Sequence, residues 1–277
     1  MIQKTFSADV AVIMSIYDKT DRGKFLLSLE SIINQTLKPN IILIVCDGCK
    51  VDSMSEIMTD LNLQGINVKF IGYDLNKGPG FARDYGIRNI TNKYIAIMDA
   101  DDISIETRLQ IQYDYMINHP DVSVVGGVIE EFNNVEGIRR FRKVPFSFDE
   151  IKKTLMKKSP VNNVTAFFSR DDYIKSGGYP PLRSSEDYCL WGRFISCNFK
   201  VINLNETLVR VEFDDTALLR RKGSTHFLND LYTQRELLNN NLINKRRYIM
   251  NVLKYFIFRN LPKFLKKTLY THILRYK

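Results

Sequence analysis

The chain has 277 residues, of which 44% are hydrophobic, so it can bury the core of one large domain and carry a smaller appendage. The net charge of +9 lies in the C-terminal stretch, because residues 237–277 contain ten lysines and arginines and no acid. The rest of the chain is therefore close to neutral, which argues against nucleic acid as its partner and directs the tail toward an anionic surface.

The N-terminus and the cysteines indicate the compartment. The first residues lack the basic stretch and apolar core of a secretory signal, and no stretch is apolar and long enough to span a bilayer. Four cysteines without an export signal predict free thiols in a reducing compartment, so we expect a cytoplasmic protein. Cys46 and Cys49 have the spacing of a redox motif, but we interpret all four as packing residues.

Four short apolar runs, residues 10–17, 41–46, 68–71 and 94–98, predict buried strands of a parallel sheet. The first is followed by Phe25, Leu29 and Ile32 at helical spacing. The other runs are followed by a helix or loop of the length that parallel strands need. The N-terminal half is therefore predicted to be an α/β sheet domain.

A loop with two glycines, residues 76–80, precedes a predicted helix after the third strand. It does not match the dinucleotide fingerprint, because Arg83 stands in place of the third glycine and the loop follows the wrong strand. Pro79 suits the first position of a helix. Arg83 either pairs with a surface neighbour such as Asp84 or binds a phosphate in bidentate fashion, and both remain open.

Three acids, Asp99, Asp101 and Asp102, follow the fourth strand. They therefore lie at the carboxyl end of a strand, where open α/β sheets bind their ligands. Clustered carboxylates suit a hard cation such as Mg²⁺ or Mn²⁺, with a nucleoside diphosphate as its anionic partner. The alternative is that Asp101 and Asp102 cap a helix expected from Ser104 onward.

Mixed structure is expected after residue 120. Residues 122–125 and 164–168 read as strands, with a break at Gly126 and Gly127, a hairpin over residues 128–144 and a helix over 148–156. A further helix is expected over residues 184–194. Its first turn carries Glu186 and Asp187, which either favour the helix start or supply a general base, and Trp191 lies on its buried side.

The basic tail predicts two amphipathic helices, one before and one after Pro262. Their apolar faces either pack on the large domain or lie on an anionic lipid leaflet, and the alternation of aromatic and basic residues fits the second. The apolar residues are Tyr248, Ile249, Val252, Leu253, Phe256 and Ile257, then Leu265, Leu269 and Ile273.

Six motifs in this order resemble glycosyltransferase family 2, and in particular its bacterial O-antigen and exopolysaccharide branch with the amylovoran-type enzymes. The resemblance implies a GT-A fold over residues 1–225, with a nucleotide-sugar half to about residue 120, an acceptor half from 121 to 225, and a helical tail over 226–277. The motifs lie at residues 12–17, 47–48, 76–83, 98–102, 177–179 and 185–191.

The resemblance also implies roles for individual residues. Asp187 corresponds to the catalytic base, and Asp101, with Asp99, to the ligands of a divalent metal, Mn²⁺ or Mg²⁺. The acceptor side corresponds to Asn163 and Trp191. A third metal ligand is not assigned, because no histidine follows Arg210 in the place where some family members have one, and His226 lies later. The positions implied for nucleotide-sugar binding are Ser15, Tyr17, Asp47, Arg83, Asp99, Ala100, Asp101, Glu186, Arg220 and Arg221.

The function that follows is inverting transfer of a sugar from a UDP donor to a saccharide on a lipid diphosphate, such as undecaprenyl diphosphate, with a β-linkage in the product. Such an enzyme is expected on the inner face of the bacterial cytoplasmic membrane. Two alternatives are a sugar-nucleotide nucleotidyltransferase and a non-catalytic peripheral membrane-binding protein. A nucleotidyltransferase of this kind usually has a glycine-rich loop with a basic residue after its first strand, and residues 15–19 do not form such a loop.

Overall fold

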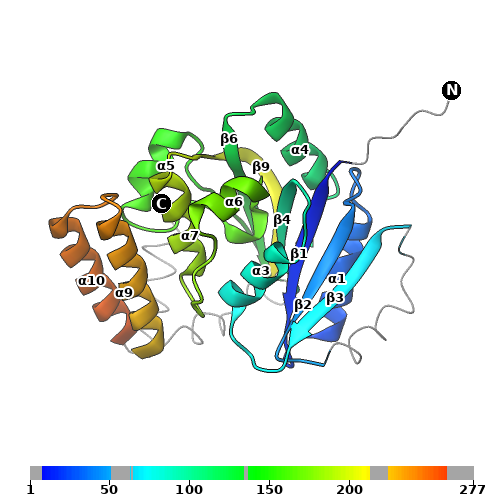
Figure 1. Cartoon of the computed structure of the whole chain (residues 1–277), viewed down its shortest axis with the longest axis horizontal. Coiled ribbons are helices and arrows are strands. Elements are labelled where there is room, and N and C mark those ends of the chain that lie inside the picture. Colours follow the sequence, from blue (N-terminus) through cyan, green and yellow to red (C-terminus); the bar gives the residue numbers. More distant parts are fainter. Residues whose placement is uncertain (1–7, 51–62, 64, 134–136, 213–223, 261–277) are drawn as a thin grey trace.

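The computed structural model describes residues 8–50, 63, 65–133, 137–212 and 224–260. Within these residues, nine strands form one mixed sheet in the order β3-β2-β1-β4-β8-β6-β9-β5, with β7 paired to β6 (Figure 1). None of the described helices is long and apolar enough to cross a membrane. The chain thus has the predicted α/β architecture.

The four predicted strands of the N-terminal half are present and parallel. They are β1 (Val10–Ile16), β2 (Ile41–Asp47), β3 (Asn67–Tyr73) and β4 (Tyr94–Asp99). Because side chains alternate along a strand, Val12 and Met14 of β1 enter one core cluster and Ala11 and Ile13 the other. The strands β1, β2 and β4 are buried on both faces, which explains why they are almost continuously apolar, whereas the edge strand β3 is only partly buried.

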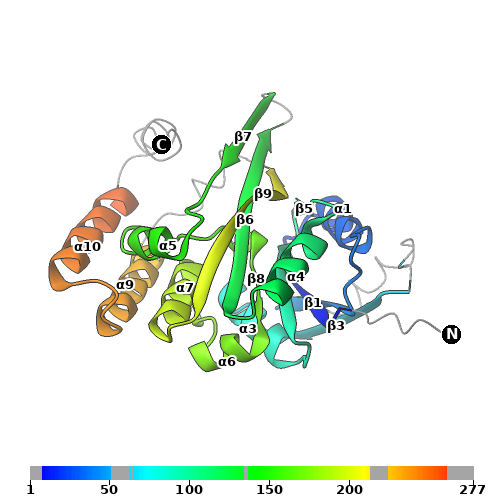
Figure 2. The same ribbon diagram turned by 90° about the horizontal axis from the view of Figure 1, so that it is seen from above.

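Helices cover the two faces of the sheet, as Figure 2 shows from above. On one face lie α1 (Arg22–Ile33) and α4 (Arg108–Asn118), whose buried residues include Leu29 and Leu109. On the other lie α3 (Pro79–Arg88), α5 (Phe148–Leu155), α6 (Arg170–Ser176) and α7 (Glu186–Ser196). Both faces are therefore dry, and ligands have access from the strand ends.

The second half contributes β5 (Asp102–Ser104), β6 (Val122–Asn133), β7 (Ile138–Arg142), β8 (Phe167–Ser169) and β9 (Lys200–Glu212). A 3₁₀ turn, η2 (Asn163–Thr165), precedes β8, so the strand expected over 164–168 is shorter than predicted. In addition, β6 runs through Gly126 and Gly127 without the expected break. A Cβ atom at Gly127 would lie 2.5 Å from Leu208 of β9, so the glycines permit close strand contact.

The acids after β4 do not cap a helix. Asp102 begins the short strand β5, which pairs antiparallel with β9, and α4 begins only at Arg108. The prediction of a helix from Ser104 onward is therefore wrong by four residues. The local sequence shows no preference for a strand here. Pairing with β9, a strand about one hundred residues later, stabilises it.

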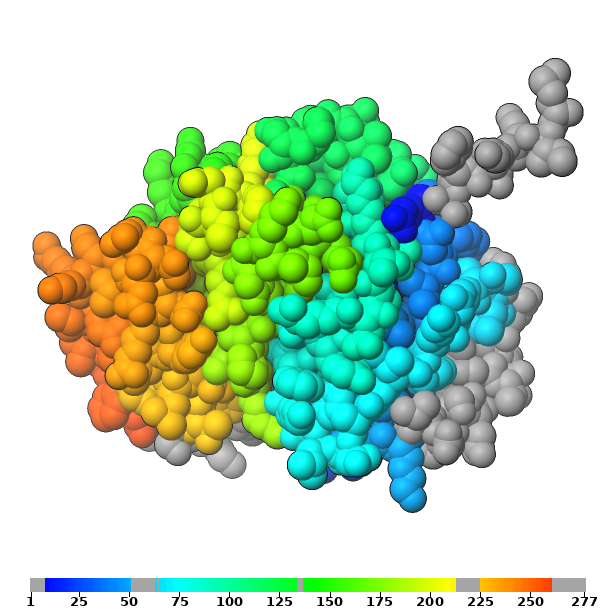
Figure 3. All heavy atoms as spheres, in the orientation of Figure 1, coloured from blue at the N-terminus to red at the C-terminus, as the bar shows by residue number. Residues whose placement is uncertain are grey.

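The C-terminal region forms two neighbouring helices, α9 (Ser224–Asn239) and α10 (Lys245–Asn260). The second was predicted from its apolar pattern. Most of α9 falls within the helical tail expected over 226–277, although no apolar pattern singled it out, and the helix expected after Pro262 lies outside the described residues. Figure 3 shows the orange α9–α10 segment lying directly against the yellow-green part of the chain. Leu237 and Ile243 are buried in the core cluster that contains α7, so these helices pack on the sheet domain.

Candidate active site

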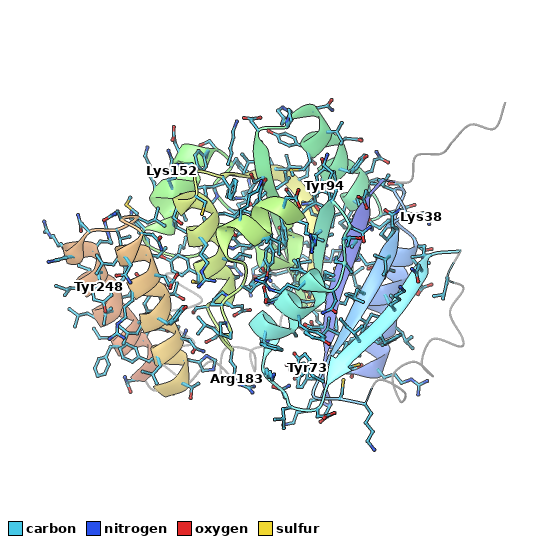
Figure 4. The ribbon with its side chains drawn as sticks, viewed as in Figure 1. Lys38, Tyr73, Tyr94, Lys152, Arg183 and Tyr248 are labelled. Carbon is cyan, nitrogen blue, oxygen red and sulfur yellow. The ribbon has the colours of Figure 1, made fainter. Side chains whose placement is uncertain are left out.

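Two adjoining cavities of about 580 Å³ and 570 Å³ open beyond the carboxyl ends of the parallel strands. In Figure 4, Tyr94 at the start of β4 lies on the opposite side of the molecule from Tyr73, the last residue of β3, and Arg183. Arg183 lines both cavities, together with Pro79 and Asp99. This edge of the sheet therefore joins the two spaces.

The first cavity is lined by residues at the ends of β1, β2 and β4. They include five of the residues implied for the nucleotide sugar in addition to Asp99: Ser15, Tyr17, Asp47, Ala100 and Asp101. The structure also adds residues to which the sequence assigned no role: Lys19, Asp21, Lys24, Asn76 and Arg183. Lys19 and Asp21 precede α1 and Lys24 lies in its first turn, and no motif spacing in the sequence indicates that they face a cavity.

Asp47 fixes the loop that leads into α3. Its Oδ1 accepts from the backbone N–H of Lys77 at 2.6 Å and its Oδ2 from that of Gly78 at 2.9 Å, while Asn76 Nδ2 donates to the Asp47 carbonyl at 3.0 Å. Each carboxylate oxygen has a second lone pair, so Asp47 can still accept a hydrogen bond from a ligand. The residue thus shapes the cavity that it lines.

Arg83 is buried and pairs with two acids from distant parts of the chain. Its Nη2 lies 2.7 Å from Asp99 Oδ1, and its Nη1 lies 2.8 Å from Glu186 Oε1. The alternative of a surface pair with Asp84 is wrong, because Asp84 pairs with Arg88 and accepts from Tyr173. Contact of Arg83 with a phosphate remains a prediction.

Burial and charge shift the pKa values of these groups. Burial raises the pKa of the Glu186 carboxyl, and the neighbouring Arg83 only partly offsets this. For Asp102, burial and then the negative charges of Asp99 and Asp101 raise the pKa well above its usual range. Behind them, burial lowers the pKa of Arg108 to about 9. Asp102 is therefore buried beside two other carboxylates.

The carboxylates fit a divalent cation. Asp99 and Asp101 both line the first cavity and offer hard oxygen ligands for such a cation. Within the described residues, however, no group of three histidines, cysteines or acids is placed to hold a metal ion. Asp99 and Asp101 would therefore supply two ligands of such a cation.

Asp187 lies in the second cavity, in the first turn of α7. Its Oδ2 accepts a hydrogen bond from Ser159 Oγ at 3.3 Å, and the helix N-terminus favours its negative charge. The neighbouring Glu186 points instead to Arg83. The two adjacent acids therefore have different surroundings.

The two residues implied for acceptor binding have different positions. Asn163 lines the second cavity, and its Oδ1 accepts from the Tyr179 hydroxyl at 2.7 Å. Trp191 is completely buried and packs on Phe194, so the expectation that it contacts an acceptor is wrong. Its large apolar surface makes it a core residue of α7. Arg220 and Arg221 lie outside the described residues.

Comparisons with known proteins identify the class of protein to which the chain belongs. The model of the family described as glycosyl transferase family 2 matches residues 11–177, more than half of the chain. The chain belongs to this family, as the sequence motifs indicated. Asp187 and the C-terminal helices lie beyond the matched range.

Individual relatives are similar over nearly the whole chain. The amylovoran biosynthesis glycosyltransferase AmsE of Erwinia amylovora is 29% identical, with 91% of this chain and 93% of the relative covered. The Escherichia coli UDP-Gal:alpha-D-GlcNAc-diphosphoundecaprenol beta-1,3-galactosyltransferase is 28% identical, with 96% of both covered. The resemblance to the O-antigen and exopolysaccharide branch is thereby confirmed.

Solved structures of Staphylococcus aureus TarS confirm the fold. TarS 1–349 in complex with UDP has a TM-score of 0.63 at 16% identity, with 89% of this chain and 70% of TarS 1–349 covered. The same fragment without a named ligand has a TM-score of 0.64 at 17% identity, covering 96% and 75%. At this identity the likeness concerns the fold alone.

The Arg83 bridge yields a prediction about stability. Arg83→Gln should lower the free energy of unfolding by about 3–5 kcal/mol at pH 8, because it leaves two carboxylates without their cation. A carboxyl whose pKa is raised in the folded state takes up its proton at a higher pH in the folded than in the unfolded chain, so it contributes less to stability as pH rises. The loss of stability caused by Arg83→Gln should therefore be smaller at pH 5, where more of this carboxyl is neutral. Denaturant unfolding at both pH values measures this.

Arg88→Gln is the matched control on the same helix, because its i,i+4 pair with Asp84 is largely exposed. That substitution should cost less than about 1 kcal/mol at both pH values. Equal losses in the two variants would contradict the assignment of Arg83 as a buried bridge.

Proposed function

We propose that the chain is a metal-assisted inverting glycosyltransferase that moves a sugar from a UDP donor to a saccharide on a lipid diphosphate. The observation that carries this proposal is the junction of two cavities at Asp99, one lined by the nucleotide-sugar half and the other containing Asp187. Family membership supports this function over the two alternatives, a nucleotidyltransferase and a non-catalytic membrane-binding protein.

The first cavity is the proposed donor site. Tyr17 and Asp47 would hold the nucleoside, with the Asp47 carboxylate accepting from the uracil imide, while Ser15 and Ala100 complete the wall. A UDP-bound structure with the same fold and a relative named for a UDP-sugar support this choice of nucleotide. Arg83 and Glu186 would support the donor from the side of the second cavity.

Asp99 and Asp101 would hold Mn²⁺ or Mg²⁺. When bound, the cation supplies positive charge to the diphosphate as it departs. The position of both carboxylates on the wall of the first cavity supports this. Arg220 and Arg221, which lie outside the described residues, are proposed to contact the diphosphate.

Asp187 is the proposed base for a single displacement. It takes the proton from an acceptor hydroxyl while that oxygen forms a bond with the anomeric carbon of the donor, and the bond from this carbon to the diphosphate breaks. The oxygen attacks opposite the departing UDP, so an α-linked donor yields a β-linkage. The position of Asp187 in the second cavity, beside Asn163, supports an acceptor there.

The outer face of α10 supports contact with an anionic membrane, as expected for a lipid-linked acceptor. Five apolar side chains are each about half exposed and recur at helical spacing: Ile249, Met250, Leu253, Phe256 and Ile257. The helix contains no acid and begins with the exposed Lys245 and Arg246. We therefore propose that the protein lies on the inner face of the cytoplasmic membrane through α10.

The base assignment is tested by Asp187→Asn, which keeps the shape of the side chain but cannot accept a proton. We expect the transfer rate to fall by about 10²–10⁴-fold while the affinity for UDP changes little, because UDP occupies the other cavity. UDP release with a lipid-diphosphate-linked saccharide measures the rate, and calorimetry measures binding. Asp114→Asn, at an exposed position on α4, is the control; wild-type turnover in Asp187→Asn would exclude this base.

The metal site is tested by calorimetric titration of UDP with and without Mn²⁺. We expect Mn²⁺ to strengthen UDP binding and Asp101→Asn to weaken the Mn²⁺-dependent part by at least about tenfold. Asp21→Asn is a control in the same cavity, because Asn replaces the Asp21 cap of α1 almost without loss. UDP affinity independent of metal in the wild type would contradict the site.

Membrane contact is tested by flotation with vesicles that contain anionic lipid. The triple substitution Ile249→Gln, Leu253→Gln and Phe256→Gln should greatly reduce the bound fraction, and high salt should weaken binding of the wild type. Leu27→Gln with Leu75→Gln removes exposed apolar side chains elsewhere and should leave binding unchanged. Equal binding of the triple variant and the wild type would exclude α10 as the contact surface.

A further inference from the structure

One face of α9 contacts the turn that precedes α7. His226 Nδ1 lies 2.9 Å from Ser184 Oγ, and Asn229 Nδ2 donates to the same hydroxyl at 3.0 Å. Asp230 and Thr233 continue this face, since positions i, i+3, i+4 and i+7 lie on one side of a helix. The hydrogen bonds of this helical face are therefore concentrated on two consecutive serines.

Ser185, the second serine of the turn, has an unusual conformation. Its φ is +61°, in the left-handed region that non-glycine residues rarely adopt. A serine at this position ordinarily accepts from the amides of its helix, but Ser185 Oγ donates to Asp230 Oδ1 at 2.7 Å, and its carbonyl accepts from Thr233 Oγ1 at 3.2 Å. Such a conformation persists only where the surroundings hold it, and here α9 does so.

Asp230 is itself fixed by α10. Arg259 donates from Nε to Asp230 Oδ2 at 2.8 Å and from Nη2 to Oδ1 at 3.1 Å, which is the fork geometry that best fixes a carboxylate. Asp230 is only 3% exposed, so its charge depends on this partner. The connection thus runs from α10 through Asp230 to Ser185.

The turn ends directly at Glu186 and Asp187, the first two residues of α7. Because Asp187 lies two residues after Ser185, the backbone of the turn determines the direction of the proposed base. Arg259, Asp230 and Ser185 also line the second cavity together with Asp187. The C-terminal helices therefore border the site where the acceptor would react.

We infer that Asp230 is a positioning residue: with Arg259 it fixes the Ser184–Ser185 turn and so directs Asp187 at the acceptor hydroxyl. This inference rests on the proposed function and deepens it, because it makes α9 and α10 part of the catalytic apparatus. Asp230 acts through the turn and takes no part in proton transfer.

Asp230→Ala in the full-length chain is the test. It removes the acceptor for Ser185 and the partner of Arg259, so kcat should fall by about 10²-fold, the effect of a small misplacement of a catalytic group. The KM for the UDP-sugar and the Kd for UDP should stay within about twofold of wild type, because the first cavity is untouched. Asp230→Asn, which keeps an acceptor for Ser185, should restore part of kcat.

Glu236→Ala is the matched control. Glu236 also lies on α9 and pairs with α7, but at its other end, where Arg193 Nε lies 3.3 Å from Glu236 Oε2. It should lose stability in thermal unfolding while kcat stays within about threefold. If both variants lost kcat in proportion to their loss of stability, the positioning role would be overturned.

A second pair of variants keeps the test decisive if Asp230→Ala folds poorly. Ser185→Gly and Ser185→Ala both remove the hydroxyl, but only glycine adopts the positive φ without strain. We therefore expect both variants to lose kcat and Ser185→Ala to lose several times more than Ser185→Gly. Wild-type kcat in Ser185→Ala would overturn the inference.

Asp187→Asn separates the two proposals. An inactive Asp187→Asn beside a fully active Asp230→Ala would overturn the positioning role and leave the proposed function intact. Absence of sugar transfer by the wild-type chain would overturn the proposed function and this inference with it.

Discussion

The buried guanidinium of Arg83 joins the parts of the molecule that the proposed reaction needs. It reaches Asp99 at the end of β4 and Glu186 at the start of α7. Glu186 lies 103 residues after Arg83 in the chain. A buried charge without partners is costly, so the position of Arg83 requires α3, β4 and α7 to meet. The two cavities share a boundary at Asp99 as a consequence.

Different partners give the acids of this edge different properties. Asp47 is held by two backbone amides, and Asp99 and Glu186 share one arginine. Asp102 is buried beside other carboxylates, which raises its pKa, whereas Asp187 sits at a helix start with a serine hydroxyl. Similar side chains can thus serve as loop support, as cation ligands and as a base, because their environments differ.

The C-terminal helices connect the surface of the protein with its proposed catalytic centre. The outer side of α10 exposes Leu253 and Phe256, while Tyr255 and Arg259 of the same helix line the second cavity. An acceptor whose lipid lies in a bilayer and whose sugar enters this cavity would meet both sides of one helix. The division of the chain at residue 225 stays a prediction, and the contacts of α9 with α7 argue for treating the two parts together.

The sequence by itself determined the parallel half of the fold, because short apolar runs separated by helices or loops of crossover length favour buried strands between two layers. It also determined the family and the acids at the strand ends, since these follow directly from local pattern. It did not predict β5, because the three residues after Asp101 have no strand signal of their own. Within the expected helical tail it did not single out α9, because this helix buries polar residues such as Asp230 and Thr233.

Tertiary structure decided which partners the chosen residues have. The sequence left Arg83 between a surface pair and a phosphate, and folding paired it with two distant acids, the half-buried Asp99 and the buried Glu186. The sequence predicted Trp191 on a helix beside the proposed base, and packing of that helix in the folded protein buried the ring completely. Hydrogen bonds and burial between residues far apart in the chain have no local signature, so only the folded molecule assigns them.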